Sequence, residues 1–139
     1  MASMSKREKL TGRKGSAPFY QAFHYIHDSA AYKGLSPSAK ALLHELCRRY
    51  NGSNNGDLSA PYSELKECGW KSDKTLANHL RELQESGLVI QTRHGGTGRI
   101  CNLYGLTWLR LDESSKYDAG MNKHIGKILS TWKQLKAVN

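Results

Sequence analysis

The chain has 139 residues, of which 38% are hydrophobic, and its 21 Lys and Arg outnumber 12 Asp and Glu to give a net charge of +9. This length suits one domain with a modest core. The sequence contains neither an uncharged apolar run long enough to cross a membrane nor the apolar stretch of a secretory signal. We therefore expect a cytoplasmic protein without a membrane partner, in which the widely spaced Cys47, Cys68 and Cys101 are reduced core thiols.

Positive charge is concentrated in separate parts of the chain. Residues 1–16 hold five Lys and Arg against one Glu, and residues 71–110 hold six against three Asp and Glu, whereas residues 17–70 are balanced. A basic excess of this kind favours a polyanionic partner such as DNA, RNA or an acidic membrane surface. Residues 1–17 also offer almost nothing apolar to bury, so we predict that they form a disordered basic arm.

Two helices are predicted at the start of the domain. Apolar residues near helical spacing indicate a short helix from Phe19 to Tyr32, which ends before Gly34. The next helix has a good N-cap in Ser36 and begins at Pro37, where the missing N–H costs nothing. Its apolar residues recur three and four apart and form one stripe: Ala39, Leu42, Leu43, Leu46 and Tyr50. The turn residues that follow this stripe end the helix.

Two further helices are predicted in the middle of the chain. A short extended stretch around Leu58 leads into a helix over residues 61–69, which Gly69 closes. Ser72 caps the next helix, and Gly87 is placed to end it. We call this helix the third helix, counting from the one that begins at Pro37, and its core stripe consists of Leu76, Leu80 and Leu83.

A hairpin is predicted directly after the third helix. Residues 88–93 and 99–108 are apolar strands, and residues 95–98 form a glycine-rich tip, because glycine alone adopts positive φ without steric cost. Arg93 and Arg99 flank this tip and can approach a nucleic-acid backbone or minor groove. The glycines remove side chains that would hold the tip away from phosphates.

The third helix carries hydrogen-bond donors opposite its leucine stripe. With the leucines directed inward at about 100° per residue, Lys74, Asn78 and Arg81 cluster on the outer face, with Thr75 beside them. Arg suits a guanine edge, Asn an adenine edge, and Lys and Thr a phosphate or a base. We interpret His79, on the flank, as an ordinary surface histidine. The candidate DNA-binding residues are Lys71, Ser72, Lys74, Thr75, Asn78, Arg81, Arg93 and Arg99.

The order of elements resembles the winged helix-turn-helix family of bacterial, phage and plasmid DNA-binding proteins, and is closest to small proteins carried on mobile elements. The resemblance covers about residues 19–109, and the segment ANHLRELQESGLV is similar to the family's recognition helix running into its wing. It implies an α+β fold with one winged helix-turn-helix domain over residues 18–110 and double-stranded DNA as the partner. It also implies roles for particular residues, with Lys74, Thr75, Asn78 and Arg81 in the major groove and Arg93 and Arg99 on the wing.

Other chemistry has weaker support. His24 and His27, like His44 and Cys47, have spacings that can hold a metal, but no second close pair of cysteines completes a structural zinc set. No glycine-rich phosphate motif ending in Lys-Ser or Lys-Thr is present, and no base partners a nucleophile, so we expect no enzyme activity and no cofactor. Binding of RNA or single-stranded DNA would need exposed aromatic side chains on which bases can stack. The candidates are five tyrosines on predicted helices, where tyrosine is more often a half-buried core residue: Tyr20, Tyr25, Tyr32, Tyr50 and Tyr62.

Residues 111–139 are assigned to a polar spacer and a final helix over residues 121–138. Apolar residues spaced four and three apart form a heptad-like seam along this helix: Met121, Ile125, Ile128, Trp132 and Leu135. Such a seam must pack, either on the chain's own first helices or on the same helix of a second subunit. We favour a homodimer through residues 121–138 that binds a palindromic site.

The sequence therefore predicts a double-stranded DNA-binding protein that acts as a sequence-specific transcriptional regulator. A replication initiator or accessory protein of a plasmid or phage would use the same residues, so that alternative stays open. An alternative of another class is a winged helix used as a protein-interaction module, which predicts no affinity for DNA at moderate salt.

Overall fold

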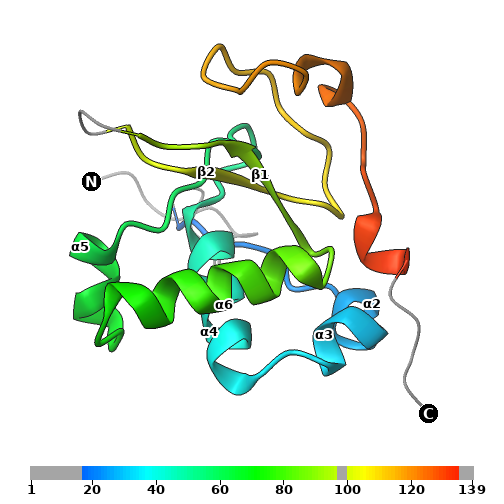
Figure 1. The fold of residues 1–139 in the computed structure, drawn as a ribbon. Helices are drawn as coiled ribbons and strands as arrows, with labels where there is room; N and C mark the ends of the chain where they lie inside the picture. The colour runs from blue at the N-terminus through cyan, green and yellow to red at the C-terminus, as the bar shows by residue number, and fades with distance from the viewer. Residues whose placement is uncertain (1–16, 97–99, 135–139) are drawn as a thin grey trace, which may run out of the picture.

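The computed structural model describes residues 17–96 and 100–134, so most of the predicted basic arm lies outside it. Within these described residues, five α-helices precede a two-stranded hairpin: α2 (His24–His27), α3 (Ala30–Lys33), α4 (Pro37–Arg49), α5 (Tyr62–Leu65), α6 (Asp73–Glu85), β1 (Val89–Arg93) and β2 (Leu103–Leu106). There are also three 3-10 helices in the described part: η1 (Lys66–Cys68), η2 (Asn122–His124) and η3 (Thr131–Gln134). In Figure 1, α6 lies across α4, the hairpin lies above them, and the described chain after β2 runs down to η3, which lies beside α2 and α3.

Helix α4 forms where its cap and its apolar stripe predict it. The Ser36 hydroxyl accepts a hydrogen bond from the Ala39 N–H, and Pro37 occupies the first helical position. One face is buried and packs against α6, so this face forms the centre of the core: Ala39, Leu42, Leu43, Leu46 and Cys47. The prediction for this helix is confirmed.

Helix α6 is confirmed as well. The Ser72 hydroxyl accepts a hydrogen bond from the Thr75 N–H at 3.1 Å, and the buried stripe is Leu76, Leu80 and Leu83. Gly87 follows the helix end at φ 83°, a left-handed conformation that glycine adopts without a steric penalty. A side chain at Gly87 would also collide with the backbone of Thr131. Gly87 therefore serves both the helix end and the approach of the C-terminal segment.

The hairpin strands pair antiparallel and are extended on one side by a third segment. The register of β1 and β2 shifts at Thr92, whose hydroxyl instead donates to the Gly56 carbonyl at 2.5 Å. Leu58 pairs with Tyr104 through two backbone hydrogen bonds of 3.1 and 2.7 Å, which confirms the short extended stretch. Strand β2 is shorter than the predicted strand over residues 99–108, because only its second half pairs with β1.

The predicted helix from Phe19 to Tyr32 is wrong as one continuous element. The chain forms α2 and α3, which are separated at Asp28 and Ser29. The Ser29 hydroxyl donates to the Ile26 carbonyl and accepts from the Tyr32 N–H, so it ends one helix and caps the next. Serine favours such local bonds over a helix interior, which explains the break.

The predicted helix over residues 121–138 is wrong in its described part. The 3-10 helices η2 and η3 are separated by an irregular stretch in which Gly126 has φ 82° and Ser130 has φ 54°. Both conformations are left-handed and cannot continue a right-handed helix. The Leu111 N–H donates to the Lys127 carbonyl at 3.0 Å, and the Leu111 carbonyl accepts from Gly126 at 2.8 Å. Backbone pairing with Leu111 therefore overrides the four-three spacing.

Without that helix, the apolar seam does not form. Trp132 packs on the chain's own core, with its ring centroid 5.9 Å from that of Tyr25. Ile128 remains 56% exposed, and Leu135 lies outside the described residues. The described C-terminal segment thus packs on the domain itself. The prediction of a homodimer therefore no longer has a helical seam to support it in the described residues.

Two further features of the interior differ from the expectation. Only Cys47 is a core thiol, whereas Cys68 and Cys101 are exposed, so the assignment of all three to the core is wrong. Asn55 is fully buried: its amide donates to the carbonyls of Leu106 and Arg110 at 3.0 and 2.9 Å and accepts from the Leu106 N–H at 2.7 Å. Asn55 therefore joins the loop after α4 to the end of β2.

Candidate nucleic-acid interface

The outer face of α6 carries the donors that the sequence predicts. Lys74, Asn78 and Arg81 are exposed on the side opposite the leucine stripe, and Glu85 lies on the same face. Among the described residues, no hydrogen bond or ion pair occupies Lys74, Asn78 or Arg81. The helix therefore presents cationic and amide groups that remain available to another molecule.

The first turn of α6 places the remaining candidates of this helix. Lys71 and Thr75 are exposed, while Ser72 is half-buried. The Ser72 hydroxyl donates to Thr75 Oγ1 at 2.7 Å in addition to capping the helix. Ser72 and Thr75 are thus engaged with each other, and Lys71 extends from the turn that precedes them.

The middle of α6 is fixed against the start of α4 by Glu82. Its carboxylate accepts hydrogen bonds from the Ser36 N–H at 2.7 Å and the Ser36 hydroxyl at 2.8 Å. His79 Nδ1 lies 3.1 Å from the same carboxylate, and its ring meets Trp70 edge-on. His79 is therefore not the ordinary surface histidine that we expected, because it supports the orientation of α6.

The candidates on the hairpin are placed differently from those on α6. The Arg93 guanidinium donates to the Cys101 carbonyl from two nitrogens, at 3.0 and 2.8 Å, so it braces one strand against the other. Arg99 lies outside the described residues. Gly95 is close-packed against the Ile100 carbonyl, and its N–H donates to the Asn102 side chain. Arg93 is thus half-buried beneath the tip rather than extended from it.

Two separate hollows lie between α6 and the hairpin, and we call them together the groove beside α6. The one near the start of α6 has a volume of about 520 Å³ and is lined by Asp73 and Ala77 on one side and by Gly95, Gly96 and Asn102 on the other. Near the end of α6 a second hollow of about 540 Å³ includes four polar side chains: Gln84, Glu85, Gln91 and His94. Both hollows flank the helix that carries the candidate donors.

The polar side chains on the hairpin side of the groove were not among the site residues predicted from the sequence. Gln91, His94 and Asn102 reach the groove because β1 and β2 run beside α6. For His94, the position immediately before the glycine tip is a sequence feature that could have indicated a site residue. No local pattern distinguishes Gln91 or Asn102 from ordinary strand residues.

His94 is held by a residue far along the chain. Asp118 Oδ2 accepts from the His94 N–H at 2.9 Å and lies 2.7 Å from His94 Nδ1. The hydrogen bond from the His94 side chain, followed by that from its backbone, holds the pKa of Asp118 below its usual range. The Asp118 N–H in turn donates to the Thr92 carbonyl at 2.9 Å. The loop after β2 therefore contacts the hairpin just before its tip.

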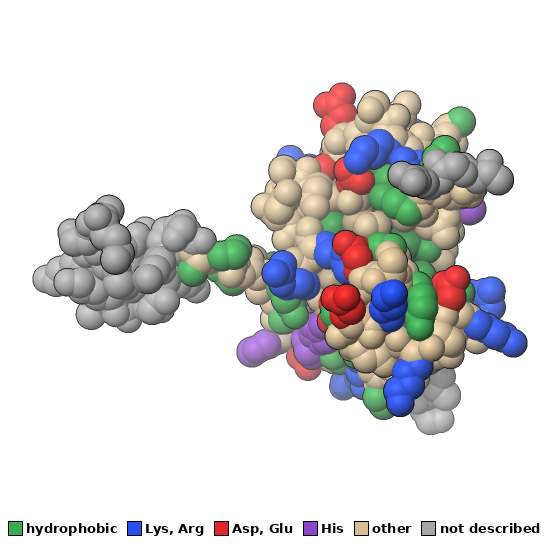
Figure 2. Space-filling model, turned by 90° about the vertical axis from the view of Figure 1, so that its left-hand side faces the viewer, with side chains coloured by type: hydrophobic (Ala, Val, Ile, Leu, Met, Phe, Trp, Pro, Cys, Tyr) green, Lys and Arg blue, Asp and Glu red, His purple; other side chains and the backbone are tan. Residues whose placement is uncertain are grey.

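Figure 2 views the molecule from the end at which α6 begins. Lys and Arg side chains lie in several separate patches on this face, with Asp and Glu side chains among them. The face is therefore not one continuous positive surface. An anionic partner here would meet individual donors rather than a uniform field.

A comparison with known protein families decides the class of the central segment. Residues 33–89 match the model of a family described as a helix-turn-helix domain. The match runs from the end of α3 through α4, α5 and α6 to the first residue of β1. No curated protein and no solved structure matches the chain.

The matched segment includes every candidate residue on α6 and the contact between Glu82 and Ser36. The hairpin beyond Val89 and the loop that carries Asp118 lie outside the match. The sequence resemblance is confirmed for the helix-turn-helix itself. The described part of the chain has no helix that is both long and apolar enough to cross a membrane.

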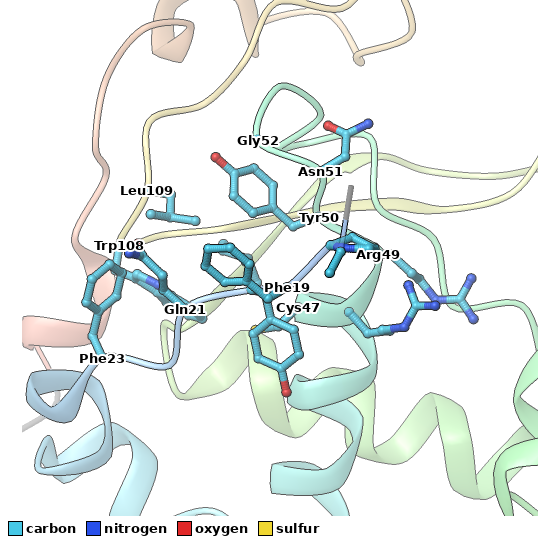
Figure 3. Close-up of a pocket in the computed structure, with 15 residues that line it drawn as sticks. Phe19, Gln21, Phe23, Cys47, Arg49, Tyr50, Asn51, Gly52, Trp108 and Leu109 are labelled. Atoms are coloured by element: carbon cyan, nitrogen blue, oxygen red, sulfur yellow. The ribbon is translucent and has the colours of Figure 1, made fainter. Parts of the chain in front are cut away.

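A larger hollow of about 730 Å³ lies where α4 ends, away from the groove beside α6 (Figure 3). Aromatic and aliphatic side chains dominate its lining: Phe19, Tyr20, Phe23, Tyr50, Trp108 and Leu109. Of its two arginines, Arg49 pairs with Glu64 at 3.0 Å. None of the candidate DNA-binding residues that the structure describes lines this hollow.

Two potential metal-binding side chains near this hollow, His44 and Cys47, are held by hydrogen bonds or by burial in the core. His44 accepts or donates a hydrogen bond at each ring nitrogen, to Tyr20 at 3.1 Å and to Tyr32 at 3.4 Å. Burial, together with the nearby His27, lowers the pKa of His44. Burial also raises the pKa of the Cys47 thiol to about 12. Within residues 17–96 and 100–134, no three His, Cys, Asp or Glu side chains gather as metal ligands do.

Proposed function

We propose that the chain binds double-stranded DNA, with the outer face of α6 in the major groove and the hairpin on the adjacent backbone. The observation that carries this proposal is the set of Lys74, Asn78 and Arg81 on the recognition-type helix of a helix-turn-helix domain, exposed and without a described partner. An α-helix fits the major groove, where these side chains can bond base edges and phosphates. The groove beside α6 leaves room for a backbone strand between helix and hairpin.

The proposed role is transcriptional regulation at a specific DNA sequence. Asn78 and Arg81 are the side chains suited to base edges, because amide and guanidinium groups can each form two hydrogen bonds to one base. Lys71, Lys74, Thr75 and the hairpin supply contacts to phosphates, which position the helix without reading sequence. The Glu82–Ser36 contact keeps the orientation of α6 fixed, so that the base-edge donors reach the groove together.

The test is a titration of the full chain against mixed-sequence duplex DNA at about 50 mM and about 200 mM salt, followed by fluorescence anisotropy. If about six phosphates are neutralised, the slope of log affinity against log salt is about −5. Replacing Lys74, Asn78 and Arg81 together by Ala is expected to abolish the preference for a selected sequence. Lys127→Ala is the matched control, since Lys127 is exposed on the C-terminal segment.

Two outcomes contradict this proposal. Absence of binding to any duplex at low salt favours the protein-interaction module, which needs no DNA. An affinity that does not change with salt also opposes it, because phosphate contacts release counterions.

A further inference from the structure

One carboxylate oxygen takes two donors from the same residue at the base of the hairpin tip. Asp118 Oδ2 lies 2.9 Å from the His94 backbone nitrogen and 2.7 Å from the His94 imidazole Nδ1. Both side chains are open to solvent, with exposures of 74% for His94 and 38% for Asp118. The pair therefore lies at the surface of the molecule rather than inside it.

Two N–H groups converging on one anionic oxygen are also the arrangement that binds a phosphate oxygen. The Asp118 carboxylate is ionised there, since hydrogen bonds from His94 hold its pKa low. His94 lines the groove together with Gln84 and Gln91, beside the outer face of α6. A backbone strand in that groove would meet the donors of His94 where the carboxylate now lies.

The phosphate and the carboxylate cannot both take these donors. The His94–Asp118 pair is exposed, so it is weak and screened by salt, and a polyanion can displace it. The hairpin does not depend on the pair alone. The Arg93 guanidinium bonds the Cys101 carbonyl, and the Thr92 hydroxyl bonds the Gly56 carbonyl. Release of the carboxylate therefore leaves the hairpin in place.

We propose that His94 is a phosphate-binding residue of the hairpin and that Asp118 is its internal competitor, which occupies the donors of His94 in the free protein and leaves them when DNA binds. This inference rests on the proposed function. It adds a residue to the interface and gives the segment after β2 a role in setting affinity. Asp118 lies outside the helix-turn-helix match.

The test compares duplex affinities of Asp118→Asn and Asp118→Ala with that of Glu113→Gln. Glu113 is exposed in the same loop, so its substitution removes one negative charge and serves as the matched control. We expect both Asp118 variants to bind at least about threefold more tightly than the control at low salt, because an anionic competitor has been removed. Thermal unfolding of each variant checks that the fold is retained.

The role of His94 is tested in the His94→Ala background. There, the imidazole donor is absent and only the backbone N–H of residue 94 remains, so the gain of Asp118→Asn over Glu113→Gln is expected to be smaller than in the unsubstituted protein. A gain of equal size would show that the imidazole is not the group for which Asp118 competes. Affinity equal to or below that of the control in both Asp118 variants overturns the inference. Asp118 would then either stabilise the hairpin or have no effect on DNA binding. Failure of the unsubstituted protein to bind any duplex overturns the proposed function itself, which is a distinct result.

Discussion

Glu82 in α6 accepts hydrogen bonds from Ser36, the residue that caps α4 and lies 46 positions earlier in the sequence. One carboxylate oxygen accepts from the Ser36 N–H and the other from its hydroxyl, at 2.7 and 2.8 Å. The same contact satisfies an N–H at the start of α4 and fixes the middle of α6 against it. The leucine stripe buries α6, and Glu82 limits how it can slide or rotate on that apolar surface.

Glu82→Gln is expected to lower the free energy of unfolding by about 1 kcal/mol at neutral pH, because a charged acceptor at a helix start is replaced by a neutral one. Burial acts to raise the pKa of Glu82, but hydrogen bonds from Ser36 and His79 outweigh it, and the folded-state pKa lies below the usual 4.5. This stabilisation is therefore complete above the unfolded value and is lost as pH falls through the folded one. Urea unfolding from neutral to acidic pH measures both effects.

Glu85→Gln is the control for that experiment, since Glu85 is exposed on the same helix. The loss expected for Glu82→Gln should shrink towards zero at acidic pH, where the native carboxylate is protonated as well. A loss that stays constant with pH would show that packing, rather than the charge of Glu82, holds α6 on α4.

Asn78→Ala and Arg81→Ala are each expected to weaken binding to a preferred duplex by about 1–3 kcal/mol and to blur its sequence preference. By contrast, Arg99→Ala and removal of residues 1–16 should weaken all sequences similarly and make the salt slope shallower. Selection of bound fragments from a random duplex pool, repeated for each variant, measures the preference. If the α6 variants keep the original motif while hairpin variants change it, the roles of helix and hairpin are reversed.

Asn55→Ala is expected to destabilise the fold by about 3 kcal/mol, because it leaves the Leu106 N–H and the carbonyls of Leu106 and Arg110 without their buried partner. Thermal or urea unfolding measures the loss. Asn54→Ala is an informative control, since Asn54 is only half-buried and bonds the Arg49 carbonyl. Equal losses for the two variants would argue against Asn55 as the junction between this loop and β2.

Trp132→Ala is expected to lower stability by about 2 kcal/mol, since the half-buried indole packs on Tyr25 and the core. Deletion of residues 121–139 should lower the unfolding temperature further, because it also removes the Leu111 pairing. Lys133→Ala, an exposed neighbour, is the control. A deleted form as stable as the full chain would indicate that the segment does not support the domain and would revive a role between subunits.

The parts predicted correctly from sequence are those in which local signals agree. In α4, the Ser36 cap and Pro37 coincide with a complete apolar stripe. In α6, the Ser72 cap precedes the buried leucines and Gly87 follows them at the end of the helix. The periodicity of α6 also predicts the outward direction of Lys74, Asn78 and Arg81, because they lie opposite the inward leucines.

The parts that failed depend on partners far along the chain. The four-three spacing around Gly126 looks helical, but pairing with Leu111 determines the backbone there. Asn55 stood in a turn-rich loop with nothing to show that it is fully buried. The Asp118 contact to His94 joins the predicted spacer to the hairpin, and Arg93 bonds the Cys101 carbonyl across the base of the tip. None of these pairings leaves a local pattern.

Where DNA lies on the molecule can be measured from the backbone amide shifts of the ¹⁵N-labelled full chain during titration with a duplex. We expect the largest changes in residues 71–82 of the α6 region and in residues 91–96 of the hairpin, with Asp118 shifting as it leaves His94. Changes confined to the hollow at the end of α4, around Phe23, Tyr50 and Trp108, with α6 unaffected, would contradict it.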